Sequence, residues 1–264
     1  MARIICCQLD IVWEDKPANY ARVRQLLKGR RVPPGAMIIL PEMFAVGFTM
    51  NVDQARESHS AESEDFLAEL AQEFGVWVLG GVVRGRPGQL ARNEAVVFDG
   101  AGKEVARYCK LQPFSLGGES DHYQAGEQVV TFRWGELTVA PFICYDLRFP
   151  ELFRAAVKQG AQFYPVIANW PVMRAGHWVT LLQARAIENL AFVAGVNRCG
   201  ADPHLRYPGR SLIVDHHGKV LADGGEREGV IEAELDVEDM VAWRERFPAL
   251  RDMRESFHGG VQTV

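Results

Sequence analysis

A single-domain, layered α/β fold with mixed sheets is predicted for this chain of 264 residues. Short apolar runs of strand type alternate with amphipathic helical stretches in the first and last parts of the chain, which is typical of sheets covered by helices. Paired β runs around turn residues indicate hairpins, and therefore antiparallel strands, in the middle and late parts. Because no change in composition marks a linker and no repeat has a fixed period, one domain over residues 1–264 is expected.

The first third of the chain is predicted to form three strands and two helices in alternation. Strands are expected over residues 3–8, 36–40 and 76–83, and helices over residues 17–28 and Glu62–Phe74. Both helical segments place apolar side chains three or four residues apart, on one face. Pro41 ends the second strand, and Gly75 ends the second helix because glycine readily adopts the left-handed conformation of a helix terminus.

Hairpins and a second α/β run are predicted for the rest of the chain. The hairpins pair residues 95–98 with Glu104–Cys109, 129–132 with 137–143 across Trp134-Gly135, and Leu212–Val214 with 220–222. The α/β run comprises a helix at 151–158, a strand at 161–167, a helix at 174–190 and a strand at 191–196. A last strand at 230–235 leads to a helix at Val237–Arg246, and a polar, glycine-rich tail is expected over residues 247–264.

Composition places the chain among ordinary globular proteins and disfavours several partners. Its net charge is −5 and its one basic run, Lys28-Gly29-Arg30-Arg31, lies at a helix end, so no nucleic-acid partner is expected. No apolar run is long enough to predict a signal peptide or a membrane span. The five cysteines are odd in number and form no C-x-x-C pair, which argues against a disulfide framework and a zinc knuckle. A reducing cytoplasm is therefore the expected location.

Cys144 is the most informative residue of the sequence. It follows an apolar run that predicts a buried strand, and it precedes a short turn into a helix that Pro150 can open. A thiol so placed lies near the N–H groups of a helix start, which favour a thiolate. It also lies at the sharp strand-to-helix turn that exposes nucleophiles in several hydrolase folds. The alternative is a buried, inert cysteine.

Three charged residues are candidates for catalysis beside this thiol. Glu42 directly follows an apolar strand, where ligand sites gather in α/β sheets, and partial desolvation there suits a general base. Lys110 ends the strand Glu104–Cys109 and can stabilise an oxyanion, although a lysine at a strand end is normally solvated. Glu119 lies in a segment, 116–122, that is expected to be a loop, where an exposed glutamate is the usual case.

Together these residues lie in segments that closely resemble the signatures of the nitrilase, or carbon–nitrogen hydrolase, superfamily. The segments are Leu40-Pro41-Glu42-Met43-Phe44, Tyr108-Cys109-Lys110-Leu111 and Ile143-Cys144-Tyr145-Asp146-Leu147-Arg148-Phe149-Pro150-Glu151. The resemblance extends from Ile4 to about Phe247. It implies a four-layer α-β-β-α sandwich and a catalytic set of Glu42, Lys110, Cys144 and Glu119.

Within that superfamily the closest resemblance is to the ω-amidases, or 2-oxoglutaramate amidases. The segments that carry it are Ala168-Asn169-Trp170-Pro171-Val172-Met173-Arg174, His177-Trp178, Ala184-Arg185-Ala186-Ile187-Glu188-Asn189 and Arg246-Phe247-Pro248. The resemblance implies hydrolysis of the amide of a short dicarboxylic acid monoamide, such as 2-oxoglutaramate or succinamate, through a thioester on Cys144. It implies no metal and no organic cofactor, a small-molecule amide as substrate, and a homodimer or larger homo-oligomer.

The resemblance also assigns a role to each catalytic residue. Glu42 would remove the thiol proton, protonate the leaving ammonia and activate water. Lys110 and the backbone N–H of Tyr145 would hold the oxyanion, and Glu119 would orient Lys110 or the substrate amide.

Tyr145, Trp170 and Arg174 are the candidates for substrate binding. Arg174 can bind the far carboxylate of the substrate with its planar fork, or it can start a helix and face solvent or another chain. Trp170 can form a wall of the pocket or belong to the core. Arg148 is expected to be structural and to pair with a carboxylate near the site.

Two other classes of function and one further motif are alternatives to this interpretation. Another carbon–nitrogen hydrolase, such as an N-carbamoyl amino acid hydrolase, an aliphatic amidase or a nitrilase, is the main alternative, and a binding module without turnover is the least favoured. The segment Asp215-His216-His217 resembles a metal motif. Because adjacent residues of a strand face opposite sides, its two histidines are not expected to share a metal, and a hairpin turn before Gly218 is expected.

Overall fold

The structure, a computed structural model, describes residues 2–56 and 61–254. Of the tail expected over residues 247–264, residues 255–264 therefore lie outside the described part. None of the helices within the described ranges is long and apolar enough to cross a membrane.

Six strands form the first sheet. In spatial order they are β15 (Gly229–Leu235), β1 (Ala2–Gln8), β2 (Met37–Ile39), β3 (Trp77–Arg84), β4 (Arg92–Phe98) and β5 (Glu104–Cys109). The pairs β1–β2 and β2–β3 are parallel, and the other three pairs are antiparallel. The sheet is therefore mixed, with a parallel centre and antiparallel edges.

The second sheet is also mixed and faces the first. Its path is β14 (Val220–Asp223), β13 (Leu212–Val214), β10 (Phe192–Asn197), β9 (Phe163–Ala168), β7 (Leu137–Val139) and β6 (Phe132–Trp134), and β8 (Phe142–Ile143) also pairs with β9. Strand β9 is parallel to β7, β8 and β10, whereas the hairpin pairs at both edges are antiparallel.

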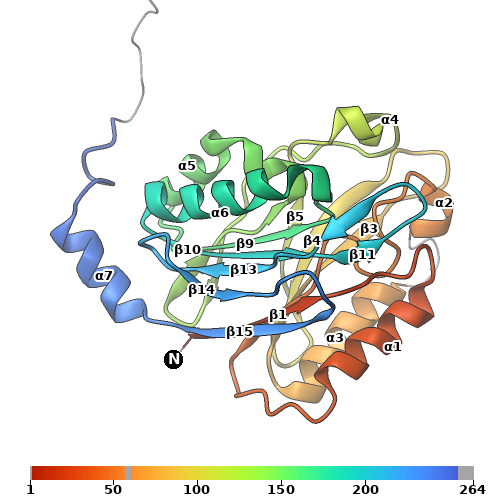
Figure 1. Cartoon of the computed structure of the whole chain (residues 1–264), viewed down its shortest axis with the longest axis horizontal. Helices are drawn as coiled ribbons and strands as arrows, with labels where there is room; N and C mark the ends of the chain where they lie inside the picture. Colours follow the sequence, from red (N-terminus) through yellow and green to blue (C-terminus); the bar gives the residue numbers. More distant parts are fainter. Residues whose placement is uncertain (1, 57–60, 255–264) are drawn as a thin grey trace, which may run out of the picture.

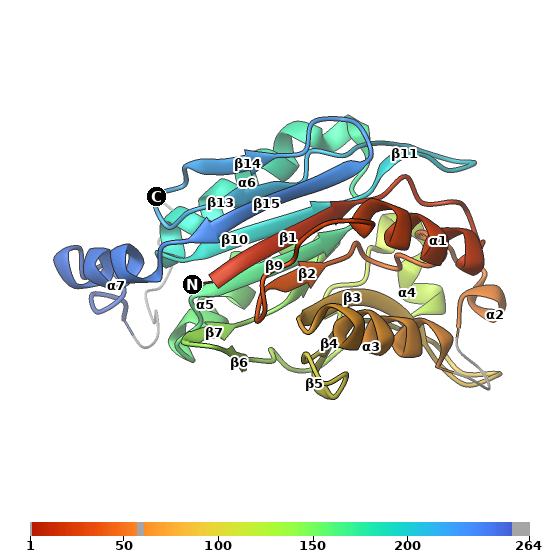
Figure 2. The same cartoon turned by 90° about the horizontal axis from the view of Figure 1, so that it is seen from below.

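Helices cover the outer face of each sheet. Helices α1 (Lys16–Leu27) and α3 (Glu62–Phe74) lie on one side of the molecule, and α5 (Pro150–Lys158) and α6 (Ala175–Asn189) lie on the other, with both sheets between them (Figure 1). Seen from below, α1 and α3 lie toward the viewer and α6 lies behind the strands (Figure 2). The predicted α-β-β-α sandwich is confirmed.

The core follows from the alternation of side chains along the strands. In β1, Ile4 and Cys6 belong to the core that includes the second sheet, whereas Ile5 and Cys7 pack with α1 and α3. All four side chains are buried. A strand buried on both faces needs a continuous apolar run, which is what the sequence has at this point.

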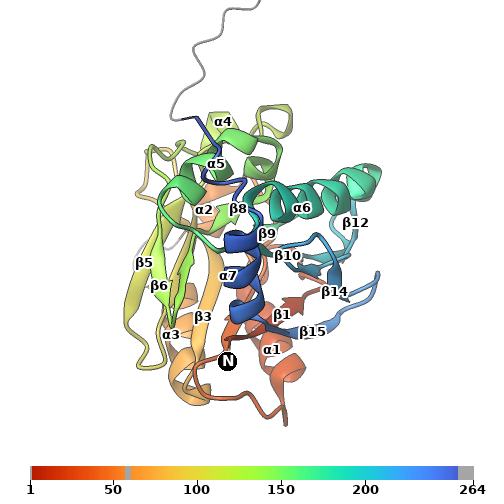
Figure 3. The same ribbon diagram turned by 90° about the vertical axis from the view of Figure 1, so that its left-hand side faces the viewer.

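Capping residues border several helices, and one of them, Gly75, was expected from the sequence. Asp15 accepts a hydrogen bond from the N–H of Ala18 (3.0 Å) at the start of α1. Gly75, with φ of 64°, ends α3. The last helix, α7 (Val237–Arg246), begins after Asp236, which accepts a hydrogen bond from the N–H of Asp239 (2.9 Å). It follows β15 and lies at one end of the sandwich (Figure 3).

Several predictions of local structure were wrong. The strand expected over residues 137–143 is interrupted at Pro141, which has no N–H for a ladder, so β7 and β8 are separate strands. The loop expected at 116–122 contains a short 3-10 helix (Ser115–Gly117) and the helix α4 (Glu119–His122). The helix α2 (Val52–Ala55) and the small hairpin of β11 (Cys199–Ala201) and β12 (Arg206–Pro208) were not foreseen.

Candidate active site

The candidate catalytic residues follow the carboxyl ends of strands. Glu42 comes shortly after β2 and Lys110 directly after β5 in the first sheet, and Cys144 directly follows β8 in the second sheet. Because the two sheets face each other, side chains at these strand ends can meet between them. Glu119 joins them from α4.

Lys110 and the two glutamates form a buried, hydrogen-bonded cluster. The Nζ atom of Lys110 lies 2.9 Å from Oε1 of Glu42 and 2.8 Å from Oε2 of Glu119. All three side chains are at most 1% exposed. One ammonium between two carboxylates leaves this cluster, when fully ionised, with one net negative charge in a site that excludes water.

Backbone and side-chain amides fix both carboxylates. Asn93 donates from Nδ2 to Oε1 of Glu42 (2.7 Å) and to Oε1 of Glu119 (2.9 Å). The backbone N–H of Asn169 donates to Oε2 of Glu42 (2.8 Å), and that of Phe114 donates to Oε2 of Glu119 (2.6 Å). Sequence reasoning did not single out Asn93 or Asn169 for these roles, although Asn169 lies in a segment that carries the resemblance.

The backbone on both sides of Glu42 is hydrogen-bonded to β3. The N–H of Gly81 donates to the carbonyl of Pro41 (3.1 Å), and the carbonyl of Gly81 accepts from the N–H of Phe44 (3.2 Å). A methyl group at Gly81 would lie 2.5 Å from the backbone nitrogen of Met43 and 2.6 Å from Cα of Glu42. This close approach requires glycine at position 81, and it sets the position of Glu42 relative to the sheet.

Cys144 occupies a sharp turn between β8 and a 3-10 helix (Cys144–Arg148). Its φ of 47° is in the left-handed region, which is unusual for a residue other than glycine and costs about 1–3 kcal/mol. The residue is 9% exposed and lines a pocket. The sharp strand-to-helix turn that the sequence predicts is therefore present, and the thiol that it carries is nearly buried.

Asp146 holds this turn in place. Its carboxylate accepts hydrogen bonds from the N–H of Ile143 (3.0 Å), the N–H of Gln112 (2.9 Å) and the hydroxyl of Tyr108 (2.8 Å). Burial raises the pKa of Asp146 to about 7, against the opposing effect of these hydrogen bonds. The turn that presents Cys144 therefore depends on a carboxyl group that can titrate near neutral pH.

Burial governs the ionisation of the nucleophile. It raises the pKa of the Cys144 thiol well above its ordinary value, and the nearby Glu42 carboxylate adds to the shift, whereas Lys110 opposes it. For Lys110, burial would lower the pKa, but the carboxylates of Glu119 and Glu42 outweigh it and the pKa lies well above the usual range. Desolvation therefore outweighs the effect of the helix N–H groups, which favours a thiolate.

The pocket outside Cys144 is lined by aromatic and apolar side chains together with two arginines. Its lining comprises Phe48, Phe114, Cys144, Tyr145, Arg148, Asn169, Trp170, Pro171, Arg174 and Leu205. Trp170 both lines this pocket and belongs to the hydrophobic core, so the two alternatives given for it are both true. Its indole N–H donates to the backbone carbonyl of Arg174 (2.8 Å).

Both arginines lie against aromatic rings and have no carboxylate partner within residues 2–56 and 61–254. The guanidinium of Arg148 lies 4.8 Å from the ring centre of Trp170, and that of Arg174 lies 5.4 Å from the ring centre of Phe114. Arg148 also contacts Nδ1 of His177 (3.2 Å). The expected pairing of Arg148 with a carboxylate is therefore wrong for the described part of the chain, and Arg174, half-buried, faces the pocket rather than bulk solvent.

Comparison with known proteins gives the same family in sequence and in structure. A model of the carbon–nitrogen hydrolase family matches residues 3–245. The 2-oxoglutaramate amidase of Bacillus subtilis is 32% identical over 97% of this chain and 98% of that protein. The omega-amidase YafV of Yersinia enterocolitica is 38% identical over 95% of this chain and 96% of that protein.

Solved structures agree with these relatives. XC1258 from Xanthomonas campestris, described as a CN-hydrolase superfamily protein with an arsenic adduct in the active site, superposes with a TM-score of 0.89 at 32% identity, covering 97% of this chain and 98% of that chain. Nit3 of Saccharomyces cerevisiae, a nitrilase superfamily member, superposes with a TM-score of 0.83 at 26% identity over 94% of each chain.

Proposed function

This chain belongs to the carbon–nitrogen hydrolase family, and from that premise we propose that it is a cysteine-dependent ω-amidase. Its reaction is the hydrolysis of the terminal amide of a short dicarboxylic acid monoamide, such as 2-oxoglutaramate or succinamate, to the acid and ammonia. The observation that carries the proposal is a nucleophile beside a buried carboxylate–ammonium cluster, at a pocket with two arginines that lack a carboxylate partner among the described residues.

The first half of the reaction forms a thioester. Because the resting Cys144 thiol is protonated, Glu42 accepts its proton as Sγ attacks the amide carbonyl carbon. The transfer brings the proton from Cys144 into the cluster, whose net charge becomes zero as the negative charge passes to the carbonyl oxygen. The carbonyl oxygen becomes an oxyanion, which the ammonium of Lys110 and the backbone N–H of Tyr145 stabilise. That N–H is in the first turn of the 3-10 helix, where backbone donors lack partners within the helix.

The second half of the reaction releases both products. Glu42 returns the proton to the amide nitrogen, the C–N bond breaks, and ammonia leaves the thioester on Cys144. Glu42 then takes a proton from water as the water oxygen attacks the thioester carbonyl. The C–S bond breaks, the proton returns to sulfur, and the carboxylic acid leaves. The sum is amide plus water to acid plus ammonia, with no cofactor.

Glu119 has a positioning role in this scheme. It accepts from Lys110 at both carboxylate oxygens, 3.0 and 2.8 Å from Nζ, and from the backbone N–H of Phe114. These contacts fix the ammonium where the oxyanion forms, and preorganised charge of this kind is usually the largest electrostatic contribution to catalysis.

The two arginines support a substrate with a carboxylate at its far end. A guanidinium binds a carboxylate through two parallel hydrogen bonds in one plane, and this interaction is stronger where water is excluded. Arg174 is the proposed partner of that carboxylate, with Arg148 beside it as a second cation. The aromatic walls formed by Trp170 and Tyr145 suit a short aliphatic chain between amide and carboxylate. The names of the relatives from Bacillus subtilis and Yersinia enterocolitica support the same substrate class.

A panel of substrates tests the proposal. Ammonia release is measured from 2-oxoglutaramate and succinamate, and from glutamine, an N-carbamoyl amino acid, an aliphatic amide and a nitrile. Turnover of the two dicarboxylate monoamides, lost in Cys144→Ala and kept in Cys109→Ala, is expected. Turnover of another class alone would keep the catalytic set and overturn the pocket assignment.

Arg174→Ala separates binding from chemistry in the same assay. Loss of a charged hydrogen bond costs about 1.5–3 kcal/mol, so kcat/KM for succinamate is expected to fall roughly 10- to 150-fold. The loss is expected mainly in KM, because the carboxylate is remote from the reacting carbonyl. For a simple aliphatic amide, Arg174→Ala is expected to leave kcat/KM nearly unchanged, and an equal loss on both substrates would contradict the assignment.

A further inference from the structure

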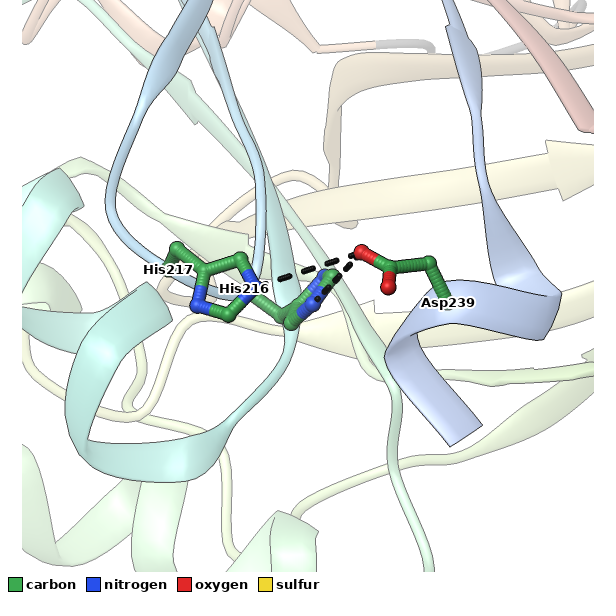
Figure 4. Close-up of side chains that lie close together, drawn as sticks. All are labelled: His216, His217 and Asp239. Atoms are coloured by element: carbon green, nitrogen blue, oxygen red, sulfur yellow. Dashed lines mark ion pairs between the residues drawn. The ribbon is translucent and has the colours of Figure 1, made fainter. Parts of the chain in front are cut away.

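A cluster of two imidazoles and a carboxylate lies where the β13–β14 hairpin meets α7. His216 and His217 occupy the turn between β13 and β14, and Asp239 lies in the first turn of α7. Figure 4 shows both rings directed toward the same carboxylate. The expectation that the adjacent histidines face opposite sides was wrong, because they lie in a turn rather than in a pleated strand.

The distances suit a shared ligand. Oδ2 of Asp239 lies 3.3 Å from Nε2 of His216 and 3.9 Å from Nε2 of His217. One ligand atom from each of the three residues lies within 4.8 Å of the other two. Four-coordinate Zn²⁺ binds at about 2.0–2.1 Å, which places neighbouring ligand atoms about 3.3 Å apart. The three groups are therefore close to the spacing of a zinc site.

His216 supplies an independent indication of a ligand. Its side chain is 2% exposed, and neither ring nitrogen has a hydrogen-bond partner within the described residues. The Asp239 oxygen is near enough for a hydrogen bond to Nε2 but is not aligned for one. An unpartnered buried donor or acceptor costs about 1–3 kcal/mol. A metal ion bound at Nε2 would satisfy that nitrogen.

The electrostatics of the cluster also suit a cation. Arg246 approaches the other carboxylate oxygen, Oδ1, at 3.8 Å, so Oδ2 remains directed to the rings. Asp215 lies beside the histidines, and Arg244 is the remaining charged group near His216. Arg244 donates instead to the carbonyls of Leu190 (2.8 Å) and Ala161 (3.0 Å).

We propose that His216, His217 and Asp239 form a zinc site that joins the β13–β14 hairpin to α7. Two imidazole nitrogens and one carboxylate oxygen leave one position of a tetrahedron for water. The site lies outside the catalytic cluster and shares no residue with it. Its role is structural, because it links the turn after β13 to the first turn of the last described helix and so holds α7 against the sandwich.

Calorimetric titration with Zn²⁺ tests this site. The protein carries Cys144→Ala, so that the nucleophilic thiol does not bind the metal, and is treated with chelator and dialysed first. One Zn²⁺ per chain is expected, with affinity at least about tenfold weaker in His217→Ala and in Asp239→Asn. His204→Ala, which removes an exposed imidazole elsewhere, is the matched control and is expected to bind as the parent does.

Thermal unfolding shows whether a variant that does not bind Zn²⁺ is still folded. Both ligand substitutions are at partly exposed positions, so the metal-free variants are expected to fold. Excess Zn²⁺ is expected to raise the Tm of the parent and of His204→Ala by mass action, and to raise that of Asp239→Asn by clearly less. Absence of saturable binding, or binding that survives both His217→Ala and Asp239→Asn, would overturn the proposal.

Discussion

At the scale of single residues, the chemistry depends on where the proton of Cys144 goes. Burial and Glu42 keep the thiol protonated at rest, so a nucleophile exists only when a base accepts that proton. Glu42 is held for this purpose by Asn93 and Lys110 at Oε1 and by Asn169 at Oε2. The mechanism therefore requires a base rather than a preformed thiolate.

Glu42→Gln tests this requirement. Glutamine keeps the shape of the side chain but cannot accept the proton. The value of kcat is therefore expected to fall by about 10²- to 10⁴-fold. Alkylation of Cys144 by iodoacetamide is expected to slow as well. Glu136→Gln, at an exposed turn, is the control and is expected to behave as wild type. Unchanged alkylation and turnover in Glu42→Gln would show that another group takes the proton.

Asp146 gives the protein a specific dependence of stability on pH. The native state keeps the Asp146 proton up to a pH of about 7, whereas the unfolded chain releases it near the ordinary value of 3.8. Between these values the native state binds more protons, so the free energy of unfolding falls as the pH rises and levels off above about pH 7. A shift of this size corresponds to at most about 4 kcal/mol.

Asp146→Asn is expected to remove this contribution, because the amide is neutral at every pH in the window. Urea unfolding at pH 5 and pH 8 measures it in both proteins. Wild type is expected to lose more stability than the variant between the two pH values. The same loss in both proteins would mean that Asp146 is ionised in the native state throughout.

Single residues were predictable from sequence where a short segment carries the chemistry. Glu42, Lys110 and Cys144 each lie in a segment with a recognisable pattern, and the structure brings Glu42 and Lys110 into direct contact. Asn93 and Asn169 could not be assigned in the same way. Their hydrogen bonds join segments that are distant in sequence, so only the folded sheets reveal them.

At the scale of elements, strongly periodic segments were predictable to the residue. The helices Glu62–Phe74 and Val237–Arg246 have the predicted bounds, because a capping or stop residue borders each of them. Shorter elements were not predictable. The hairpin of β11 and β12 has three residues in each strand, too few for a pattern of alternation to stand out.

Strand β3 offers a sharp test of how an element positions the site. Gly81→Ala places a methyl group against the backbone of Glu42 and Met43, which cannot move without displacing the base. Stability is expected to fall by about 1–3 kcal/mol and kcat by at least about 10²-fold. Gly80→Ala is the matched control, because its methyl group meets only the flexible end of Leu67, at 2.8 Å.

The two variants are compared by urea unfolding and by kcat. Gly80→Ala is expected to lose stability with little loss of kcat. Its methyl group meets the side chain of Leu67 in α3, and not the backbone of Glu42. Equal loss of kcat in both variants would mean that any added methyl group on β3 disturbs the site. The close contact between Gly81 and the backbone of Glu42 would then not be what positions the base.

At the scale of the whole molecule, the sandwich brings the two halves of the site together. The first sheet supplies Glu42 and Lys110, and the second supplies Cys144 and Asn169. The two halves meet because the sheets pack face to face with the ends of these strands at the same edge. Sequence patterns predicted mixed sheets and helices, and the family resemblance implied the four-layer sandwich. The spatial order of the strands came from the structure alone, since pairing of distant strands leaves no local pattern.

Assembly and location are also properties of the whole molecule. A homodimer or larger homo-oligomer and a cytoplasmic location remain predictions from the sequence. Sedimentation of the purified protein measures the first directly, and a monomer at working concentrations would contradict it.

The central claim is that Cys144 becomes acylated during turnover. Intact-mass spectrometry of protein quenched with acid during turnover of succinamate tests it most directly, with peptide mapping to locate the adduct. We expect a fraction of wild-type chains to carry the substrate mass less ammonia on Cys144, and none to do so in Cys144→Ala. Ammonia release without an adduct, undiminished in Cys144→Ala, would contradict the account.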